Sequence, residues 1–101
     1  PIIVVNDGST DNTGNLLEHI TGITLLHHPK NQGKGAALLT GFATAHELGC
    51  SRAVTIDGDG QHDPADVPKL IETSRDRHPC LVIGCRHNMN RLKHVPWTSR
   101  F

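Results

Sequence analysis

Short runs of apolar residues alternate along the chain with segments in which apolar residues recur at helical spacing. Four continuous apolar runs predict β-strands: residues 2–5, 23–27, 53–56 and 81–83. The first run is β-branched and unbroken, which predicts a strand buried on both faces. Strands that alternate with helices are typical of a parallel sheet with right-handed crossovers. The predicted fold class is therefore α/β, a three-layer α/β/α domain with a mainly parallel sheet.

Three helices are predicted between these strands. Their apolar stripes are Leu16, Leu17 and Ile20; Leu38, Leu39 and Phe42; and Val67, Leu70 and Ile71. The N-cap candidates of the first helix are Ser9, Thr10 and Asp11. The third helix begins with Asp63 as N-cap and Pro64 as first helical residue, because proline is preorganised for that position. Gly22 and Gly49 mark the ends of the first and second helices.

Polar residues gather where the predicted strands end. In a parallel α/β sheet the carboxyl ends of the strands meet helix N-termini at one edge, where ligands bind. The polar groups that follow the four strands in turn are Asn6 and Asp7; residues 31–35; residues 57–61; and Arg86. The opposite edge is built from ordinary linkers such as residues 49–51. This asymmetry predicts one binding site at the carboxyl edge of the sheet.

The segment Asp-Gly-Asp-Gly-Gln at residues 57–61 carries the clearest chemistry. In an extended backbone alternate side chains share a face, so Asp57, Asp59 and Gln61 could direct oxygen atoms at one point. Hard oxygen ligands suit Mg²⁺ or Mn²⁺, and two carboxylates leave coordination positions for water and a diphosphate. The alternative is a plain Asp-Gly turn. A hairpin is disfavoured, because a helix signal follows directly at Asp63.

Other polar segments leave two interpretations open. Residues 31–35 lack the distant first glycine and the hydroxyl residue of a P-loop, so their glycine amides and Lys34 either help to hold a diphosphate or let the helix pack closely. Asp7 is either a turn or cap residue or an acceptor for a base or ribose donor. Cys85 and His87 lack further ligands at the spacing of a zinc site. Only His62, inside the acidic loop formed by residues 57–62, is a candidate to support ligand-binding groups there.

The charge balance bears on partners. Ten basic residues offset ten acidic ones, so no global field predicts nucleic-acid binding. Residues 86–101 form a basic tail without carboxylates that contains Trp97. This tail suits either a lipid phosphate at a membrane surface or a poorly ordered terminus. Three cysteines without a CxxC pair suggest a reducing compartment, which predicts a cytoplasmic protein at the inner face of the membrane.

Three motifs resemble those of family 2 glycosyltransferases of the GT-A type. They are Ile-Val-Val-Asn-Asp-Gly-Ser-Thr-Asp-Asn-Thr at residues 3–13, Asn-Gln-Gly-Lys-Gly-Ala-Ala at 31–37 and Asp-Gly-Asp-Gly-Gln-His-Asp-Pro at 57–64. The last motif, followed by Val-Ile-Gly-Cys-Arg at 82–86, is similar to the branch that contains dolichyl- and polyprenyl-phosphate sugar synthases. The resemblance spans residues 2–86 and implies transfer of a sugar, with inversion, from a UDP- or GDP-linked donor.

The resemblance also implies roles for individual residues. Asn6 and Asp7 are expected to contact the nucleoside, and Asp57 to lie near the ribose and diphosphate. The expected metal ligands, in the DXD motif of the family, are Asp59 and Gln61. Lys34 and Arg86 are further diphosphate candidates. No catalytic residue is assigned within residues 1–101, because the general base of such enzymes is expected downstream of Phe101.

The chain departs from the family pattern in two respects. The family commonly has two aspartates where this chain has Asn6 and Asp7, which would alter the contacts to the base. A first strand is expected before Pro1 and the acceptor-binding half after Phe101, so residues 1–101 are expected to form one partial GT-A domain. Such a piece would bind the donor with weak or no transfer, and could self-associate through an exposed sheet edge.

Two other functional classes remain as alternatives. A non-catalytic, receiver-like or interaction domain could hold Mg²⁺ on the same acidic edge without a nucleotide. A sugar nucleotidyltransferase shares the α/β design, but it usually has a glycine-rich basic loop where this chain has Asn6, Asp7 and Gly8. Nucleotide dependence separates the first alternative from the glycosyltransferase hypothesis.

Overall fold

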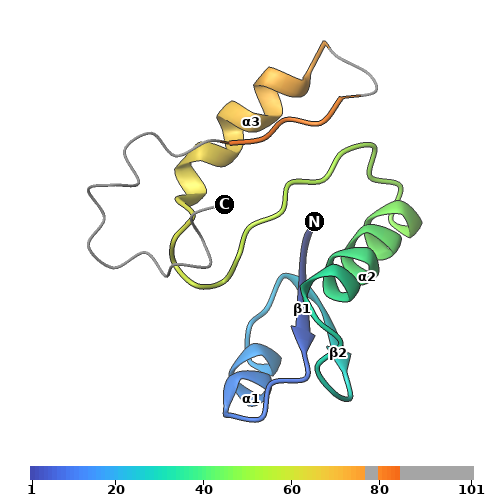
Figure 1. Cartoon of the computed structure of the whole chain (residues 1–101), viewed down its shortest axis with the longest axis vertical. Coiled ribbons are helices and arrows are strands. Elements are labelled where there is room, and N and C mark those ends of the chain that lie inside the picture. Colours follow the sequence, from blue (N-terminus) through green and yellow to red (C-terminus); the bar gives the residue numbers. More distant parts are fainter. Residues whose placement is uncertain (77–79, 85–101) are drawn as a thin grey trace. The chain divides into compact units, whose positions relative to one another are not determined.

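The computed structural model describes residues 1–76 and 80–84. These residues fall into two compact units, Pro1–Thr55 and the part that begins at Ile56, and each is described by itself. The first unit contains β1 (Ile2–Asp7), α1 (Thr13–Glu18), β2 (Ile23–His28) and α2 (Lys34–Glu47). The second contains a short 3₁₀ helix, η1 (Pro64–Asp66), which leads directly into α3 (Val67–Ser74). Figure 1 shows the elements in chain order.

The first unit is a β-α-β-α arrangement around a parallel pair of strands. β1 and β2 pair in register from Ile2 opposite Ile23 to Asp7 opposite His28. Because successive side chains of a strand point to opposite faces, this register places the last two pairs of residues on different faces. α2 packs on β1 and α1 on β2. The predicted parallel sheet with helices on both faces is therefore present for these two strands.

The close contacts of two glycines assign each helix to a face of the sheet. A Cβ added to Gly41 of α2 would lie 3.6 Å from Cγ2 of Val5, so α2 covers the face that carries Val5 and, two residues on, Asp7. A Cβ added to Gly14 of α1 would lie 3.4 Å from Nδ2 of Asn6, so α1 covers the other face. The last residues of β1 are thus enclosed from both sides.

Two expected strands do not form in the described residues. Residues 53–56 and 81–83 have no strand partner, and the described sheet has two strands. A strand needs a neighbouring backbone for its N–H and C=O groups, and a single apolar run does not supply one. Leu81 and Ile83 are also 84% and 73% exposed, so these runs are not packed as buried strands. The three-layer sheet is shown only in its β1–β2 part.

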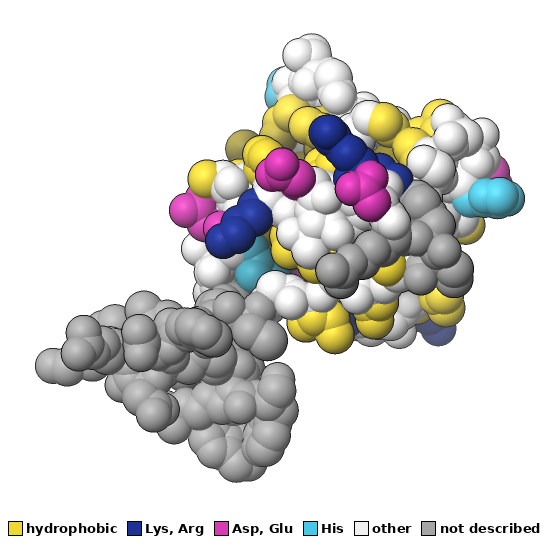
Figure 2. Space-filling view, turned by 90° about the horizontal axis from the view of Figure 1, so that it is seen from above, with side chains coloured by type: hydrophobic (Ala, Val, Ile, Leu, Met, Phe, Trp, Pro, Cys, Tyr) yellow, Lys and Arg dark blue, Asp and Glu magenta, His cyan; other side chains and the backbone are white. Residues whose placement is uncertain are grey.

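Burial is lower than the apolar runs predict. Among the described residues only Ala45 and Asn6 are buried, each 7% exposed, and Ile2 is 63% exposed. The expectation that the first strand is buried on both faces is therefore wrong here, because two helices and one neighbouring strand leave its first residue largely uncovered. Apolar side chains are visible at the surface in Figure 2.

The helix ends agree with the sequence signals in part. α2 ends at Glu47, and Gly49 adopts φ +75° just beyond it, as expected for a glycine that terminates a helix. Asp63 accepts a hydrogen bond from the Ala65 N–H, as predicted, although the first turn is 3₁₀. The N-cap of α1 is Asn12 and none of the three predicted candidates. Asp11 instead accepts from the Thr13 N–H at 2.9 Å, which places its carboxylate in a local turn before the helix.

Gly8 provides a test of how tightly the loop after β1 packs. Its φ is +68°, and an added Cβ would lie 2.3 Å from the Lys30 carbonyl carbon and from the Asn31 nitrogen. Gly22 has φ +80° but nothing within 4 Å of an added Cβ, so it is a matched control. We expect Gly22→Ala to cost about 1–2 kcal/mol from the left-handed backbone alone. Gly8→Ala should cost a further ~1–3 kcal/mol from overpacking, measured by urea unfolding. Equal losses for the two variants would contradict the close approach.

Candidate nucleotide-binding site

The loops that follow β1 and β2 meet at the carboxyl edge of the sheet, as the sequence predicts. Asp7 is the last residue of β1, and α2 begins at Lys34 with Gly33 as its N-cap. The Gln32 N–H donates to Oδ1 of Asp7 at 2.9 Å, and the Gly33 N–H donates to Oδ2 at 2.8 Å. The Gly33 N–H is shared with Oδ1 of Asn31 at 3.0 Å. One carboxylate therefore joins the end of β1 to the start of α2.

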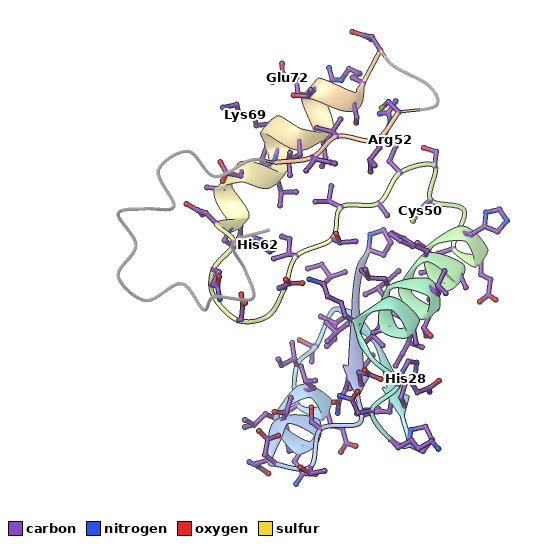
Figure 3. The ribbon with its side chains drawn as sticks, in the orientation of Figure 1. His28, Cys50, Arg52, His62, Lys69 and Glu72 are labelled. Carbon is purple, nitrogen blue, oxygen red and sulfur yellow. The ribbon has the colours of Figure 1, made fainter. Side chains whose placement is uncertain are left out.

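His28 completes this cluster. Its Nδ1 lies 2.6 Å from Oδ1 of Asp7, and its Nε2 lies 2.9 Å from Oγ1 of Thr40 on α2. A carboxylate oxygen only accepts hydrogen bonds, so Nδ1 of His28 carries the proton. The Thr40 hydroxyl can either donate to Nε2 or accept from it, which keeps the contact in both protonation states of the ring. Figure 3 shows His28 on the β2 strand.

The environment of Asp7 favours its ionised form. The backbone hydrogen bond from Gln32 is the largest cause that lowers the pKa of Asp7 below its ordinary value of 3.8. The hydrogen bond from His28 lowers the pKa of Asp7 further, desolvation opposes it to a smaller extent, and the hydrogen bond from Gly33 adds a still smaller lowering. The Asp7 side chain is 16% exposed. Asp7 is thus a carboxylate at neutral pH, fixed by three donors and still reachable from solvent.

Asn6 lies on the other face of the sheet and is 7% exposed. Its Nδ2 contacts Nδ1 of His27 at 3.1 Å, and its Oδ1 accepts from the Ser9 N–H at 3.1 Å. Because the Asn6 amide nitrogen can only donate, the contacted nitrogen of His27 is the unprotonated one. The neighbouring histidines of β2 therefore have opposite tautomers. The sequence alone assigned no role to either of them, because the register that places them opposite Asn6 and Asp7 comes from the structure.

The acidic loop belongs to the second unit and forms a turn rather than an extended segment. The chain turns at Gly58 and Asp59, and Gly60 has φ +73°. Oδ1 of Asp59 accepts from the Gln61 N–H at 2.9 Å. The predicted alternation, with Asp57, Asp59 and Gln61 sharing one face of an extended backbone, is therefore wrong. Gly58 and Gly60 permit a tight turn. The turn is favoured over an extended backbone because it gives the Asp59 carboxylate a local hydrogen bond.

His62 holds the acidic loop together. Its Nδ1 accepts a hydrogen bond from the Asp57 N–H at 2.9 Å, which closes the loop between the two residues. His62 is labelled in Figure 3. This contact agrees with the expectation that His62 supports the groups of this loop, and it acts on the backbone of Asp57. Asp57 and Gln61 each have an interaction partner within the protein as well.

The described residues contain no group of three or more His, Cys, Asp or Glu side chains placed to hold a metal ion. The acidic loop offers carboxylate and amide oxygens, which is the donor chemistry of Mg²⁺ or Mn²⁺. It fits a cation that takes a few protein oxygens and completes its coordination with water and phosphate, and it does not fit an all-protein site.

Several predicted features fall outside the described residues. These are Arg86, the basic tail at residues 86–101 with Trp97, and the pair Cys85 and His87. Cys50 and Cys80 are free thiols. In residues 1–76 and 80–84 no helix has the length and apolar character that crossing a membrane requires.

A carboxylate-organised loop at the end of a parallel strand, beside a helix N-terminus, lies where α/β proteins bind their ligands. Residues 1–100 match the sequence model of the family described as Glycosyl transferase family 2. The chain belongs to this family. That membership favours the glycosyltransferase hypothesis over the receiver-like domain and the nucleotidyltransferase.

Curated relatives match over nearly the whole chain. One is the UDP-N-acetylglucosamine–dolichyl-phosphate N-acetylglucosaminyltransferase of Methanococcus voltae, 34% identical over 98% of this chain and 46% of the relative. The polyprenol monophosphomannose synthase of Mycolicibacterium smegmatis is 33% identical over 95% of the chain and 38% of the relative. The undecaprenyl-phosphate mannosyltransferase of Micrococcus luteus is 36% identical over 98% and 42%. The chain thus spans less than half the length of these relatives. No solved structure matches it.

Asp7→Asn tests the link between β1 and α2. Because the pKa of Asp7 is lowered on folding, its contribution to stability is present above the unfolded pKa and is lost as pH falls through the folded value, below 3.8. We expect Asp7→Asn to lower the urea midpoint at pH 7. The difference from the unsubstituted chain should shrink as pH falls below 3.8. The control is Glu18→Gln at the exposed end of α1. A difference between the Asp7 variant and the parent that does not change with pH would refute this role of the carboxylate.

Proposed function

We propose that the chain binds a nucleotide-diphosphate sugar and supplies the donor side of an inverting transfer to a polyprenyl or dolichyl phosphate. The family and the names of its relatives support sugar transfer to lipid phosphates. The structural observation that carries the donor half is the fixed Asp7 carboxylate at the carboxyl edge of the sheet. The reaction is proposed to take place at the cytoplasmic face of the membrane, where the lipid phosphate is presented.

Asp7 retains capacity for a ligand. Its carboxylate has about four lone-pair positions, and Gln32, Gly33 and His28 occupy three of them. The remaining position, on Oδ2, can accept from an N–H of a base or from a ribose hydroxyl. Asn6 is nearly buried and uses both ends of its amide, so we assign it to shaping the loop around the nucleoside rather than to reading the base.

The diphosphate is assigned to other groups. The Gln32 and Gly33 amides already donate to Asp7, so an anion could use them only by displacing that carboxylate. Of the two interpretations of residues 31–35, this favours a backbone that lets the helix pack closely over a backbone that binds phosphate. The Lys34 and Arg86 side chains and the neighbourhood of Asp57 remain the proposed diphosphate contacts.

The metal is assigned to the acidic loop. Asp59 would hold Mg²⁺ or Mn²⁺ with Asp57 and Gln61 as further oxygen donors, while the Asp59–Gln61 turn and the His62 bond keep the loop in shape. A bound divalent cation would neutralise charge on a departing nucleoside diphosphate. The exposed edges of the two-stranded sheet remain the proposed route for self-association.

Titration calorimetry with UDP and GDP, with and without Mn²⁺, tests this proposal. We expect one of the two nucleotides to bind, with affinity raised on the order of tenfold or more by Mn²⁺, because the cation screens the diphosphate from the acidic loop. Asp59→Ala should remove the metal dependence. Asp66→Ala is the matched control, since Asp66 is an exposed carboxylate in η1 outside the acidic loop. Mn²⁺ binding without any nucleotide binding by folded protein would favour the metal-holding, receiver-like alternative instead.

A further inference from the structure

His28 is the residue that ties the three elements at the carboxyl edge together. It lies at the end of β2, directly opposite Asp7 of β1 in the parallel register. One ring nitrogen contacts the Asp7 carboxylate at 2.6 Å and the other contacts the Thr40 hydroxyl of α2 at 2.9 Å. The ring is only 10% exposed, so its orientation is set by these two partners and by packing.

The geometry points to His28 as a positioning residue for nucleotide binding: it fixes the Asp7 carboxylate so that Oδ2 faces a ligand donor. This inference rests on the proposed donor site at Asp7. His28 and the Gln32 N–H share Oδ1, whereas Oδ2 receives only the Gly33 N–H. The two donors on Oδ1 restrain rotation of the carboxylate about its Cβ–Cγ bond. The Oδ2 atom therefore keeps a fixed orientation, and one of its two lone pairs remains available to a ligand donor.

Preorganisation is the physical benefit of this arrangement. An acceptor that is already oriented pays no conformational entropy when a base or ribose donor arrives. Without the His28 bond, the Asp7 carboxylate could rotate between the backbone amides and solvent. The Gln32 and Gly33 amides would still hold one orientation part of the time. The loss of His28 should therefore weaken nucleotide binding without abolishing it, and it should leave the fold in place.

Two substitutions separate positioning from packing. His28→Leu fills similar space without any hydrogen-bond donor. His28→Asn places an amide N–H near the position of the original Nδ1, so it can restore the bond to Asp7 while losing the Thr40 contact. His46→Asn is the control, because His46 is an exposed histidine near the end of α2.

The first measurement follows the titration of Asp7 by NMR. The chemical shift of the Gln32 amide proton reports it, because this N–H donates a hydrogen bond to Asp7. The hydrogen bond and the charge of His28 both lower the pKa of Asp7. We therefore expect the midpoint to rise in His28→Leu and to return partly towards the original value in His28→Asn. It should stay unchanged in His46→Asn. An unchanged midpoint in His28→Leu would overturn the inference, and this result does not depend on nucleotide binding.

The second measurement is the affinity for UDP and GDP in the presence of Mn²⁺. We expect His28→Leu to bind the preferred nucleotide on the order of tenfold more weakly, with His28→Asn recovering most of the loss. Equal affinity of the parent chain and His28→Leu would overturn the positioning role. Failure of the parent chain to bind either nucleotide would instead reject the proposed function, and the positioning of Asp7 would then be decided by its titration alone.

Discussion

The Asp7 carboxylate is the constraint on which the first unit of the structure depends. It ends β1, accepts from the two amides that precede α2, and contacts the histidine that ends β2. Buried or half-buried backbone amides must find acceptors, and at a helix N-terminus an anion is the most favourable one. By supplying that anion from a neighbouring strand, the chain fixes where α2 begins relative to the sheet. The close approach of Gly8 to the backbone of Lys30 and Asn31 follows from the same junction.

The parallel register gives each face of the sheet its own polar pair. Asp7 with His28 lies under α2, and Asn6 with His27 lies under α1. In a unit with little fully buried surface, these hydrogen-bonded pairs specify the strand ends more sharply than apolar contact does. Asparagine suits position 6, because an amide can donate to His27 while accepting from Ser9. A carboxylate at that position could only accept.

Local signals explain which parts of the fold were predictable. The runs before Asn6 and Pro29 predicted β1 and β2, and apolar spacing with glycine or proline punctuation predicted α1, α2 and α3. Residues 53–56 read equally well as a strand but have no strand partner in the described part of the chain, because pairing is a non-local property. The meeting of polar groups after the first two strands was predictable, because the carboxyl ends of parallel strands lie at the same edge of a sheet. The extended shape expected for the acidic loop did not form, since Gly58 and Gly60 allow a turn that alternation alone cannot reveal.

The roles of the histidines were beyond reach of the sequence for a similar reason. His28 at the end of an apolar run looks like any strand terminus until the register places Asp7 opposite it. Membership in the glycosyltransferase family then connects the Asp7–His28 pair with nucleotide binding, because a nucleotide is expected at the same edge of the sheet. In the proposed function, Asp7 supplies an oriented acceptor, and the loop at residues 57–61 supplies oxygen donors for the metal.

The most direct test of this account is an NMR titration of the ¹⁵N-labelled chain with UDP and with GDP in the presence of Mg²⁺. The account predicts that the amides of Asp7 and Gly33 and those of Asp59 and Gln61 shift together, with one common dissociation constant, for the preferred nucleotide. Shifts confined to the acidic loop, with the same profile for Mg²⁺ alone, would contradict a donor site and leave a simple cation-binding loop.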